Sequence, residues 1–126
     1  MKSVYTRNKL RLEFIPYIEE NYNPNFVQSL LNLSEIAREE NDFLDEITDS
    51  HYKKCVLEKD NIQIYVQKFN SLNKVIKKRV LRKSLEWYNI SLKDIHFNHI
   101  ELLAELFYKD NGSMIDLPNQ VYAVKE

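Results

Sequence analysis

Residues 25–60 read NFVQSLLNLSEIAREENDFLDEITDSHYKKCVLEKD and contain neither glycine nor proline. Residues suited to the buried face of a helix recur there every three or four positions. They are Val27, Leu30, Leu33, Ile36, Ala37, Leu44, Ile47, His51 and Cys55. An unbroken helix to Glu58 would measure roughly 50 Å, whereas a domain of this chain length has a radius of gyration of roughly 14 Å. We therefore expect a long helix that either breaks near Asp49 and Ser50 or contacts something outside the chain.

The whole chain has 126 residues and a single glycine, Gly112. Average composition would supply about nine glycines, at roughly 7%. Phosphate-binding loops of nucleotide enzymes need two or three clustered glycines, and so does a glycine-rich nucleophile elbow. The composition therefore excludes these sites within the chain and favours long helices over tight turns.

The remaining composition is that of an ordinary single domain with a modest core. Hydrophobic residues make up 44% of the chain, and the one cysteine, Cys55, excludes an intrachain disulfide. A lone cysteine suits a reducing compartment, so we expect a cytoplasmic location. The sequence has no apolar run of membrane-spanning length and no signal-peptide core, so we expect no membrane association.

Before the long helix, a first helix is predicted with Thr6 as its N-cap and an apolar face that includes Leu10, Phe14 and Ile18. Pro16 lies inside that pattern, so we expect a kink or break near Phe14 and Ile15. Asparagine followed by proline, at residues 23 and 24, then predicts the start of the long helix.

After the long helix, alternation of β-branched residues predicts a strand over Ile62–Val66. A third helix is expected from Asn70 or Ser71 and a fourth from about His96 to Lys109. Their buried faces would hold Leu72, Ile76, Val80, Leu81, Leu85 and Tyr88, and Ile100, Leu103, Ala104 and Phe107. Residues 113–124 resemble a hairpin, which we expect to join the first strand in one sheet. The predicted fold class is α+β, mainly helical, with about four helices including one long helix and a small antiparallel sheet.

The net charge of −1 hides three charged blocks. Residues 2–11 hold four basic residues and no acid, residues 13–49 hold ten acids and one base, and residues 68–83 hold seven bases and no acid. On the third helix, five cations share one face: Lys74, Lys78, Arg79, Arg82 and Lys83. Such a face is typical of contact with a nucleic-acid backbone. The same spacing also fits a solvated face, or pairing with the acidic long helix.

Other residue clusters carry weaker indications of chemistry. The pairs His96 with His99 and His51 with Cys55 offer two metal ligands each, whereas zinc sites need three or four protein ligands. We therefore predict no metal site, with His96 as a helix N-cap and Cys55 as a core residue. Several carboxylates are paired along the long helix, but none is distinguished as a catalytic acid. No active site can be assigned from these residues.

Taken in order, several short motifs resemble the tRNA(Ile)-lysidine synthetases of bacteria. The first group resembles the stretch that follows their catalytic domain: Arg7-Asn8-Lys9-Leu10-Arg11, Ile15-Pro16 and Tyr22-Asn23-Pro24-Asn25. The second group resembles their substrate-recognition domain: Lys78-Arg79-Val80-Leu81-Arg82, His99-Ile100-Glu101 and Gly112-Ser113-Met114-Ile115-Asp116-Leu117-Pro118. The resemblance covers nearly the whole chain. One departure is Gln120, where relatives often show a glycine.

The resemblance implies tRNA processing by a ligase. In that family ATP, with Mg, adenylates the wobble cytidine of the CAU-anticodon isoleucine tRNA, and lysine then displaces AMP to give lysidine. The Ser-Gly-Gly-x-Asp-Ser loop of the ATP-binding catalytic domain is missing here. The chain therefore resembles a fragment that is inactive alone and holds no cofactor. Residues 1–22 would be the linker helix after the catalytic domain, and residues 23–126 the substrate-recognition, tRNA-binding domain.

The resemblance also implies roles for particular residues. Arg7, Asn8 and Arg11 would lie at the junction with the catalytic domain, near the nucleotide or bound tRNA, or would serve as structural contacts there. The five cations of the third helix would hold the tRNA backbone. Without the catalytic domain as partner, apolar surface around Leu10, Phe14 and Ile18 should be exposed and could support a homodimer. The alternative is a stand-alone helical protein-interaction module.

Overall fold

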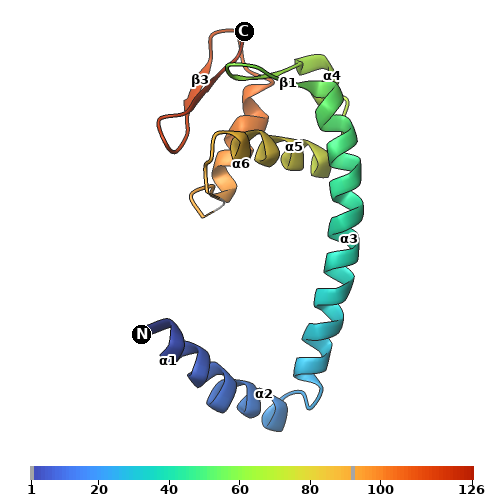
Figure 1. Ribbon diagram of the computed structural model, residues 1–126, viewed down its shortest axis with the longest axis vertical. Coiled ribbons are helices and arrows are strands. Elements are labelled where there is room, and N and C mark those ends of the chain that lie inside the picture. Colours follow the sequence, from blue (N-terminus) through green and yellow to red (C-terminus); the bar gives the residue numbers. More distant parts are fainter. Residues whose placement is uncertain (1, 92) are drawn as a thin grey trace. The chain divides into compact units, whose positions relative to one another are not determined.

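The computed structural model describes residues 2–91 and 93–126 (Figure 1). The chain forms two compact units, Met1–Asp42 and Phe43–Glu126, called unit 1 and unit 2 below. The boundary between them falls inside one helix. The functional division after residue 22 is a boundary of another kind and stays a prediction.

Unit 1 begins with a helix that changes its winding before Pro16. It consists of α1 (Lys2–Lys9), the π-helix η1 (Leu10–Phe14) and α2 (Ile15–Asn21). Proline has no N–H to donate and its ring crowds the preceding turn, so regular α-helical bonding cannot continue through it. The predicted irregularity near Phe14 and Ile15 is confirmed. The prediction of Thr6 as an N-cap is wrong, because the helix already includes Lys2.

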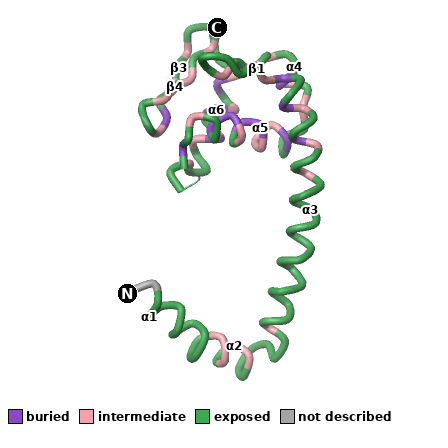
Figure 2. The backbone as a smooth tube through the Cα atoms, in the orientation of Figure 1, coloured by how far each residue is buried: buried purple, intermediate pink, exposed green. Residues whose placement is uncertain are grey.

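The long helix α3 spans Phe26–Cys55 without interruption. Asn23 lies at its start, where the side-chain Oδ1 accepts a hydrogen bond from the N–H of Asn25 at 3.0 Å. The predicted alternative of a break near Asp49 and Ser50 is wrong. Every residue from 27 to 43 is exposed, and burial begins in the part of α3 that belongs to unit 2 (Figure 2).

A tight hairpin follows α3 directly. Strand β1 (Val56–Glu58) pairs antiparallel with β2 (Ile62–Ile64). The sequence predicted helix as far as Glu58, which is wrong for Val56–Glu58 because these residues form β1. It also predicted the second strand as Ile62–Val66, two residues longer than β2. The excess arises because Val66 opens a short helix, α4 (Val66–Asn70), that the sequence pattern did not reveal.

Two longer helices complete the helical part of unit 2. Helix α5 (Lys74–Trp87) begins after Asn73, whose Oδ1 accepts the N–H of Val75 at 2.9 Å. It starts later than predicted because α4 occupies the preceding residues. Helix α6 (Phe97–Leu106) begins after His96, as predicted, and ends three residues before Lys109.

The C-terminal segment forms the predicted hairpin from β3 (Met114–Asp116) and β4 (Tyr122–Val124). Its turn holds Asn119 and Gln120 at φ angles of 60° and 59°. The prediction that this hairpin shares a sheet with Ile62–Val66 is wrong, because β1–β2 and β3–β4 form separate two-stranded sheets. The predicted class, α+β and mainly helical with one long helix, is confirmed.

The hydrophobic core lies in unit 2, where buried residues from α3, α4, α5 and α6 meet (Figure 2). Its largest fully buried side chain is Phe69, 1% exposed, which stacks on Phe107 with ring centroids 3.9 Å apart. The other buried members are Tyr52, Ile76, Val80, Leu81, Leu85, Ile90, Ile100, Leu103 and Leu117. This core fixes which side of α5 faces solvent.

Candidate nucleic-acid interface

The amphipathic pattern of α5 places its cations on the outer side of unit 2. Ile76, Val80, Leu81 and Leu85 are buried on one face of the helix. Lys74 and Arg82 are exposed, whereas Lys78, Arg79 and Lys83 are half-buried. The five predicted tRNA-binding residues thus lie on one helix but in two different environments.

The three half-buried cations are held in ion pairs. Lys78 Nζ lies 2.5 Å from Glu101 Oε1 on α6, and Arg79 Nη1 lies 2.9 Å from Asp45 Oδ1 on α3. Lys83 pairs with Asp49, also on α3. The interpretation of the basic block as a partner of the acidic long helix is therefore confirmed for Arg79 and Lys83. These pairs neutralise part of the positive face within unit 2.

Two of the paired carboxylates show the electrostatic effect of their partners. The hydrogen bond from Lys83 holds the pKa of Asp49 below its ordinary value, and that from Lys78 does the same for the pKa of Glu101. Lys74 adds a smaller attraction on Glu101. Both carboxylates are therefore ionised at neutral pH.

Lys74 and Arg82 form no ion pair with any residue that the structure describes. They are eight positions apart on α5, so both lie along one side of the helix. Of the five predicted residues, these two are the ones with charge directly available to a polyanion. The other three would have to exchange a carboxylate partner for a phosphate.

Exposed aromatic rings accompany the cations, a feature that the sequence reasoning missed. Lys77 Nζ lies 3.1 Å from the hydroxyl of Tyr108, and Lys78 Nζ lies 5.1 Å from the ring centroid of Phe97. Both rings belong to α6 or its C-terminal end, and both are about 70% exposed. Neighbouring cations and exposed rings suit the backbone and the bases of single-stranded RNA. The packing of α6 on α5 creates these pairs, so no local sequence pattern could have revealed them.

Arg7, Asn8 and Arg11 lie on unit 1. Arg7 and Asn8 belong to α1, Arg11 belongs to η1, and all three are exposed. Neither arginine forms an ion pair with a described residue. Their predicted role at a junction with a catalytic domain stays a prediction.

The histidines and the cysteine have structural surroundings. Cys55 is 2% exposed, and its burial raises the pKa of the thiol, which suppresses the nucleophilic thiolate. His99 accepts a hydrogen bond at Nδ1 from the N–H of His96, at 3.0 Å, and so helps to begin α6. No group of three or more histidine, cysteine or acidic residues capable of holding a metal occurs among the described residues.

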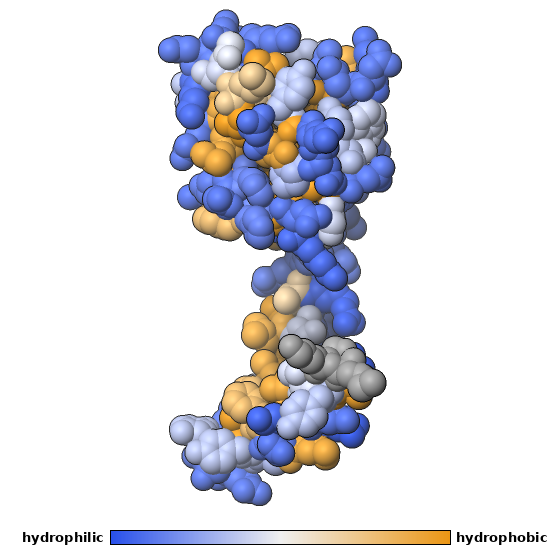
Figure 3. Space-filling view, turned by 90° about the vertical axis from the view of Figure 1, so that its left-hand side faces the viewer, coloured by the Kyte–Doolittle hydropathy of each residue, from blue (hydrophilic) through white to orange (hydrophobic). Residues whose placement is uncertain are grey.

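None of the described helices is both long enough and apolar enough to span a bilayer. Unit 1 exposes Leu10 and Phe14 by about half, while Ile18 is half-buried. Leu30, Leu31, Leu33 and Ile36 on α3 are also exposed. Figure 3 shows such apolar surface gathered on unit 1.

Comparison with known proteins found relatives along essentially the whole chain. A tRNA(Ile)-lysidine synthase of Clostridium perfringens is 34% identical over 131 residues, covering 100% of this chain. That of Caldanaerobacter subterraneus is 31% identical over 125 residues and covers 98%. The chain resembles one region of the tRNA(Ile)-lysidine synthases. No protein-family profile matches it.

The similarity is restricted to a part of those enzymes. The chain spans about a quarter of the length of the relatives it matches, 27% in the two synthases above and 28% in that of Clostridioides difficile. The resemblance to tRNA(Ile)-lysidine synthases predicted from the motifs is therefore confirmed, with the chain corresponding to one region of the enzyme.

Proposed function

We propose that this chain is the region of a tRNA(Ile)-lysidine synthase that helps to recognise and position tRNA. The observation that carries the proposal is the similarity over the entire chain to synthases named for tRNA(Ile). The α5 face supports it, because Lys74 and Arg82 are exposed without an ion pair to a described residue, and because Lys77 and Lys78 lie near the exposed rings of Tyr108 and Phe97. Cations neutralise phosphates, and exposed rings accept unpaired bases.

The chemical steps belong, in this proposal, to another region of the synthase. That region would bind ATP with Mg, activate the wobble cytidine and admit lysine. The present chain would contribute affinity and would orient the tRNA through contacts to its phosphate backbone. Such contacts position a nucleic acid without reading its sequence. Arg7, Asn8 and Arg11 would lie near the junction with the catalytic region. We place the enzyme in the cytoplasm with its tRNA.

The ion pairs determine how the α5 face should be tested. Changing Lys78 or Arg79 to Glu would place two carboxylates against each other and disturb the fold as well as RNA binding. The variant Lys74→Glu/Arg82→Glu limits this repulsion, because neither residue is ion-paired with a described residue and Lys74 exerts only a smaller attraction on Glu101. The matched control is Lys59→Glu/Lys109→Glu, called the control pair, which makes the same charge change at two exposed lysines outside α5.

The measurement is equilibrium binding of an in vitro tRNA(Ile) transcript across a salt series. We expect the α5 variant to lose about tenfold or more in affinity at low salt and to show a shallower salt dependence, by roughly one unit of slope per lost phosphate contact. The control pair should lose less than about threefold. Equal losses in both variants, or no binding of tRNA by the unmodified chain, would contradict the proposal.

We further infer that the exposed apolar residues of unit 1 are covered by another protein surface. The first candidate is the catalytic region of the same synthase, since Leu10 and Phe14 lie beside the proposed junction residues on α1 and η1. A second copy of the chain, giving a homodimer, is the other. Contiguous exposed apolar surface of this kind typically marks a protein contact. The same surface would serve the alternative function, a stand-alone helical protein-interaction module.

A further inference from the structure

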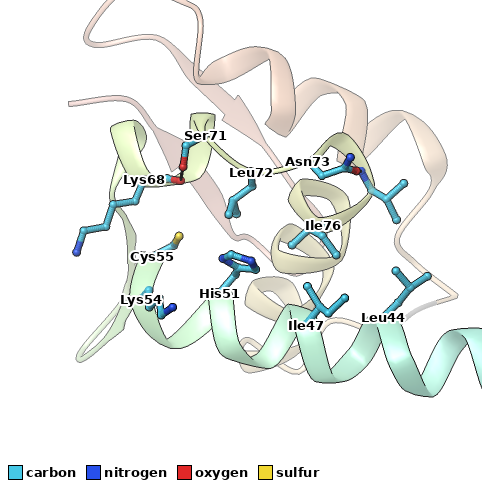
Figure 4. A pocket seen from close by; sticks show the side chains of 11 residues that line it. Leu44, Ile47, His51, Lys54, Cys55, Lys68, Ser71, Leu72, Asn73 and Ile76 are labelled. Carbon is cyan, nitrogen blue, oxygen red and sulfur yellow. Dashed lines mark hydrogen bonds between the residues drawn. The ribbon is translucent and has the colours of Figure 1, made fainter.

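A separate cavity of about 820 Å³ lies in unit 2, beside the first turn of α5. It opens between the C-terminal part of α3, the end of α4 and the first turn of α5 (Figure 4). Its lining residues are Leu44, Ile47, His51, Lys54, Cys55, Lys68, Ser71, Leu72, Asn73, Val75 and Ile76. The volume lies within the range of small-molecule sites, about 300–1,000 Å³.

One wall of the cavity is apolar and suits a flat ring. Figure 4 shows Leu72 and Ile76 facing the imidazole of His51 across the opening, with Ile47 and Leu44 along α3. Aliphatic side chains and an imidazole can hold an aromatic ring by burial and stacking. This wall therefore accommodates a planar ligand of limited polarity.

The other end of the cavity is positive. Lys54 and Lys68 line it, both are exposed, and neither forms an ion pair with a described residue. The Lys68 side chain extends outward (Figure 4), where its Nζ lies 4.9 Å from the ring centroid of Tyr65, so it would have to turn inward to meet an anion in the cavity. The charges of both lysines act on the buried thiol of Cys55, the last residue of α3. No aspartate or glutamate occurs among the described lining residues. The uncompensated charge favours an anion next to the apolar wall.

Polar groups at the rim add hydrogen-bonding capacity. The Ser71 hydroxyl donates to the carbonyl of Lys68 at 2.7 Å, which leaves its oxygen able to accept. Asn73 uses its Oδ1 to cap α5, so its NH2 group has no described partner. A base edge presents both acceptors and donors, which matches these two groups.

We propose that this cavity binds one nucleotide, with the base against Leu72 and Ile76 beside His51 and the phosphate at Lys54 and Lys68. The proposal deepens the proposed function and rests on it for the source of the ligand, an unpaired nucleotide of the bound tRNA. Sequence-tolerant pockets for unpaired bases combine stacking with a positive groove in this way. A free nucleoside monophosphate has the same chemistry and is the other source to be distinguished.

The test uses two variants of the full chain. Lys54→Ala/Lys68→Ala removes the positive end and leaves the core intact, while Leu72→Trp fills the cavity. Lys59→Ala/Lys109→Ala is the matched control, since these exposed lysines do not line the cavity. The probes are 5′-AMP, 5′-CMP, a tRNA(Ile) transcript and a blunt RNA duplex of twelve base pairs. Side-chain NMR signals of His51 and Leu72 report occupancy, and equilibrium binding reports affinity.

We expect tRNA to shift the His51 and Leu72 signals, and each cavity variant to bind tRNA about tenfold or more weakly while duplex binding changes less than about threefold. The control should change neither. If mononucleotides shift those signals while tRNA binding is insensitive to the cavity variants, the nucleotide site stands and its source is a free nucleotide. If tRNA binds the unmodified chain but no probe shifts the signals and no cavity variant matters, the nucleotide site is refuted and the proposed function stands. If tRNA does not bind at all, the proposed function fails, and the mononucleotide spectra decide the cavity alone.

Discussion

The guanidinium of Arg79 on α5 lies 2.9 Å from a carboxylate oxygen of Asp45 on α3, thirty-four positions earlier in the chain. One turn further along each helix, Lys83 pairs with Asp49 in the same way. The acidic and basic blocks of the sequence therefore meet, at least in part, within unit 2. Some of the charged residues in these blocks therefore hold α5 against α3, and the remaining charges are available to a partner.

The first prediction concerns the strength of the Arg79–Asp45 pair. Since the Asp45 side chain is 58% exposed, we expect a coupling free energy of about 0.2–1 kcal/mol. The measurement is a double-mutant cycle in urea with Asp45→Ala, Arg79→Ala and the combined variant. A coupling several times larger would mean that the pair is shielded from water more than its exposure indicates.

The second prediction concerns pH. The folded-state pKa values of Asp49 and Glu101 are lowered by their lysine partners, so both groups stabilise the fold at neutral pH. This contribution is complete above the ordinary carboxylate pKa, about 4, and disappears as the pH falls through the lowered folded-state values.

The measurement is the melting temperature from pH 7 to pH 2 in the unmodified chain and in Asp49→Asn/Glu101→Gln. We expect the variant to melt lower at pH 7, with the difference shrinking toward pH 2. A difference that is constant across the range would show that the carboxylate charges do not provide the stabilisation.

The third prediction concerns the turn between β3 and β4. Gln120 has a φ angle of 59°, a conformation that costs a residue with a Cβ about 1–2 kcal/mol. We expect Gln120→Gly to raise the free energy of unfolding by about 1 kcal/mol. Asn119→Gly is the matched control at φ 60°, and its effect should be smaller because asparagine tolerates this region better. Equal increases in the free energy of unfolding from the two variants would show that asparagine is no better tolerated than glutamine in this turn.

The fourth prediction separates the two units energetically. Phe69 is 1% exposed in the unit 2 core, so Phe69→Ala should reduce the stability of unit 2 by about 3–5 kcal/mol. Phe14 is 52% exposed on unit 1, so Phe14→Ala should change the unfolding of unit 2 by less than about 0.5 kcal/mol. Fluorescence of Trp87, the one tryptophan, reports unit 2. Comparable losses from the two changes would mean that the exposed phenylalanine takes part in the unit 2 core.

The fifth prediction concerns the apolar surface of unit 1. We expect the isolated chain to associate with itself in sedimentation experiments, and Leu10→Ser/Phe14→Ser to weaken that association by about tenfold or more. Addition of the catalytic region of a synthase should compete with self-association. If that region binds the serine variant as well as the unmodified chain, the covering role of these residues is wrong.

Sequence periodicity predicted the helices well where a long apolar face enters the core. The buried residues of α5 and the N-cap position of α6 are as predicted, and Pro16 produces its irregularity where expected. Short elements were missed. Val56–Glu58 falls within the predicted bounds of the long helix yet forms a strand, because pairing with β2 outweighs a weak local preference. Strand partners are set by tertiary contacts that a single sequence does not contain.

The candidate site, too, could be predicted only in part from the sequence. Helical spacing predicted that five cations share one face of α5, whereas in the structure two of them are exposed and three are half-buried against carboxylates of α3 and α6. Helical spacing alone could not reveal which of these cations have carboxylate partners, since Glu101, Asp45 and Asp49 are distant in sequence. The rings of Phe97 and Tyr108 beside the lysines, and the cavity around His51, likewise arise from helix packing.

The position of the unit boundary inside α3 has a consequence for local unfolding. Residues 27–43 of this helix are exposed throughout, whereas Thr48, Tyr52 and Cys55 are buried. An isolated helical segment of that length is only marginally stable in water. Amide protons of one continuous helix should therefore exchange with solvent deuterium at two very different rates, fast toward Phe26 and slow toward Cys55. A partner that covers the exposed half would slow the exchange of the fast protons, so the exchange pattern of this one helix would report whether a partner is bound.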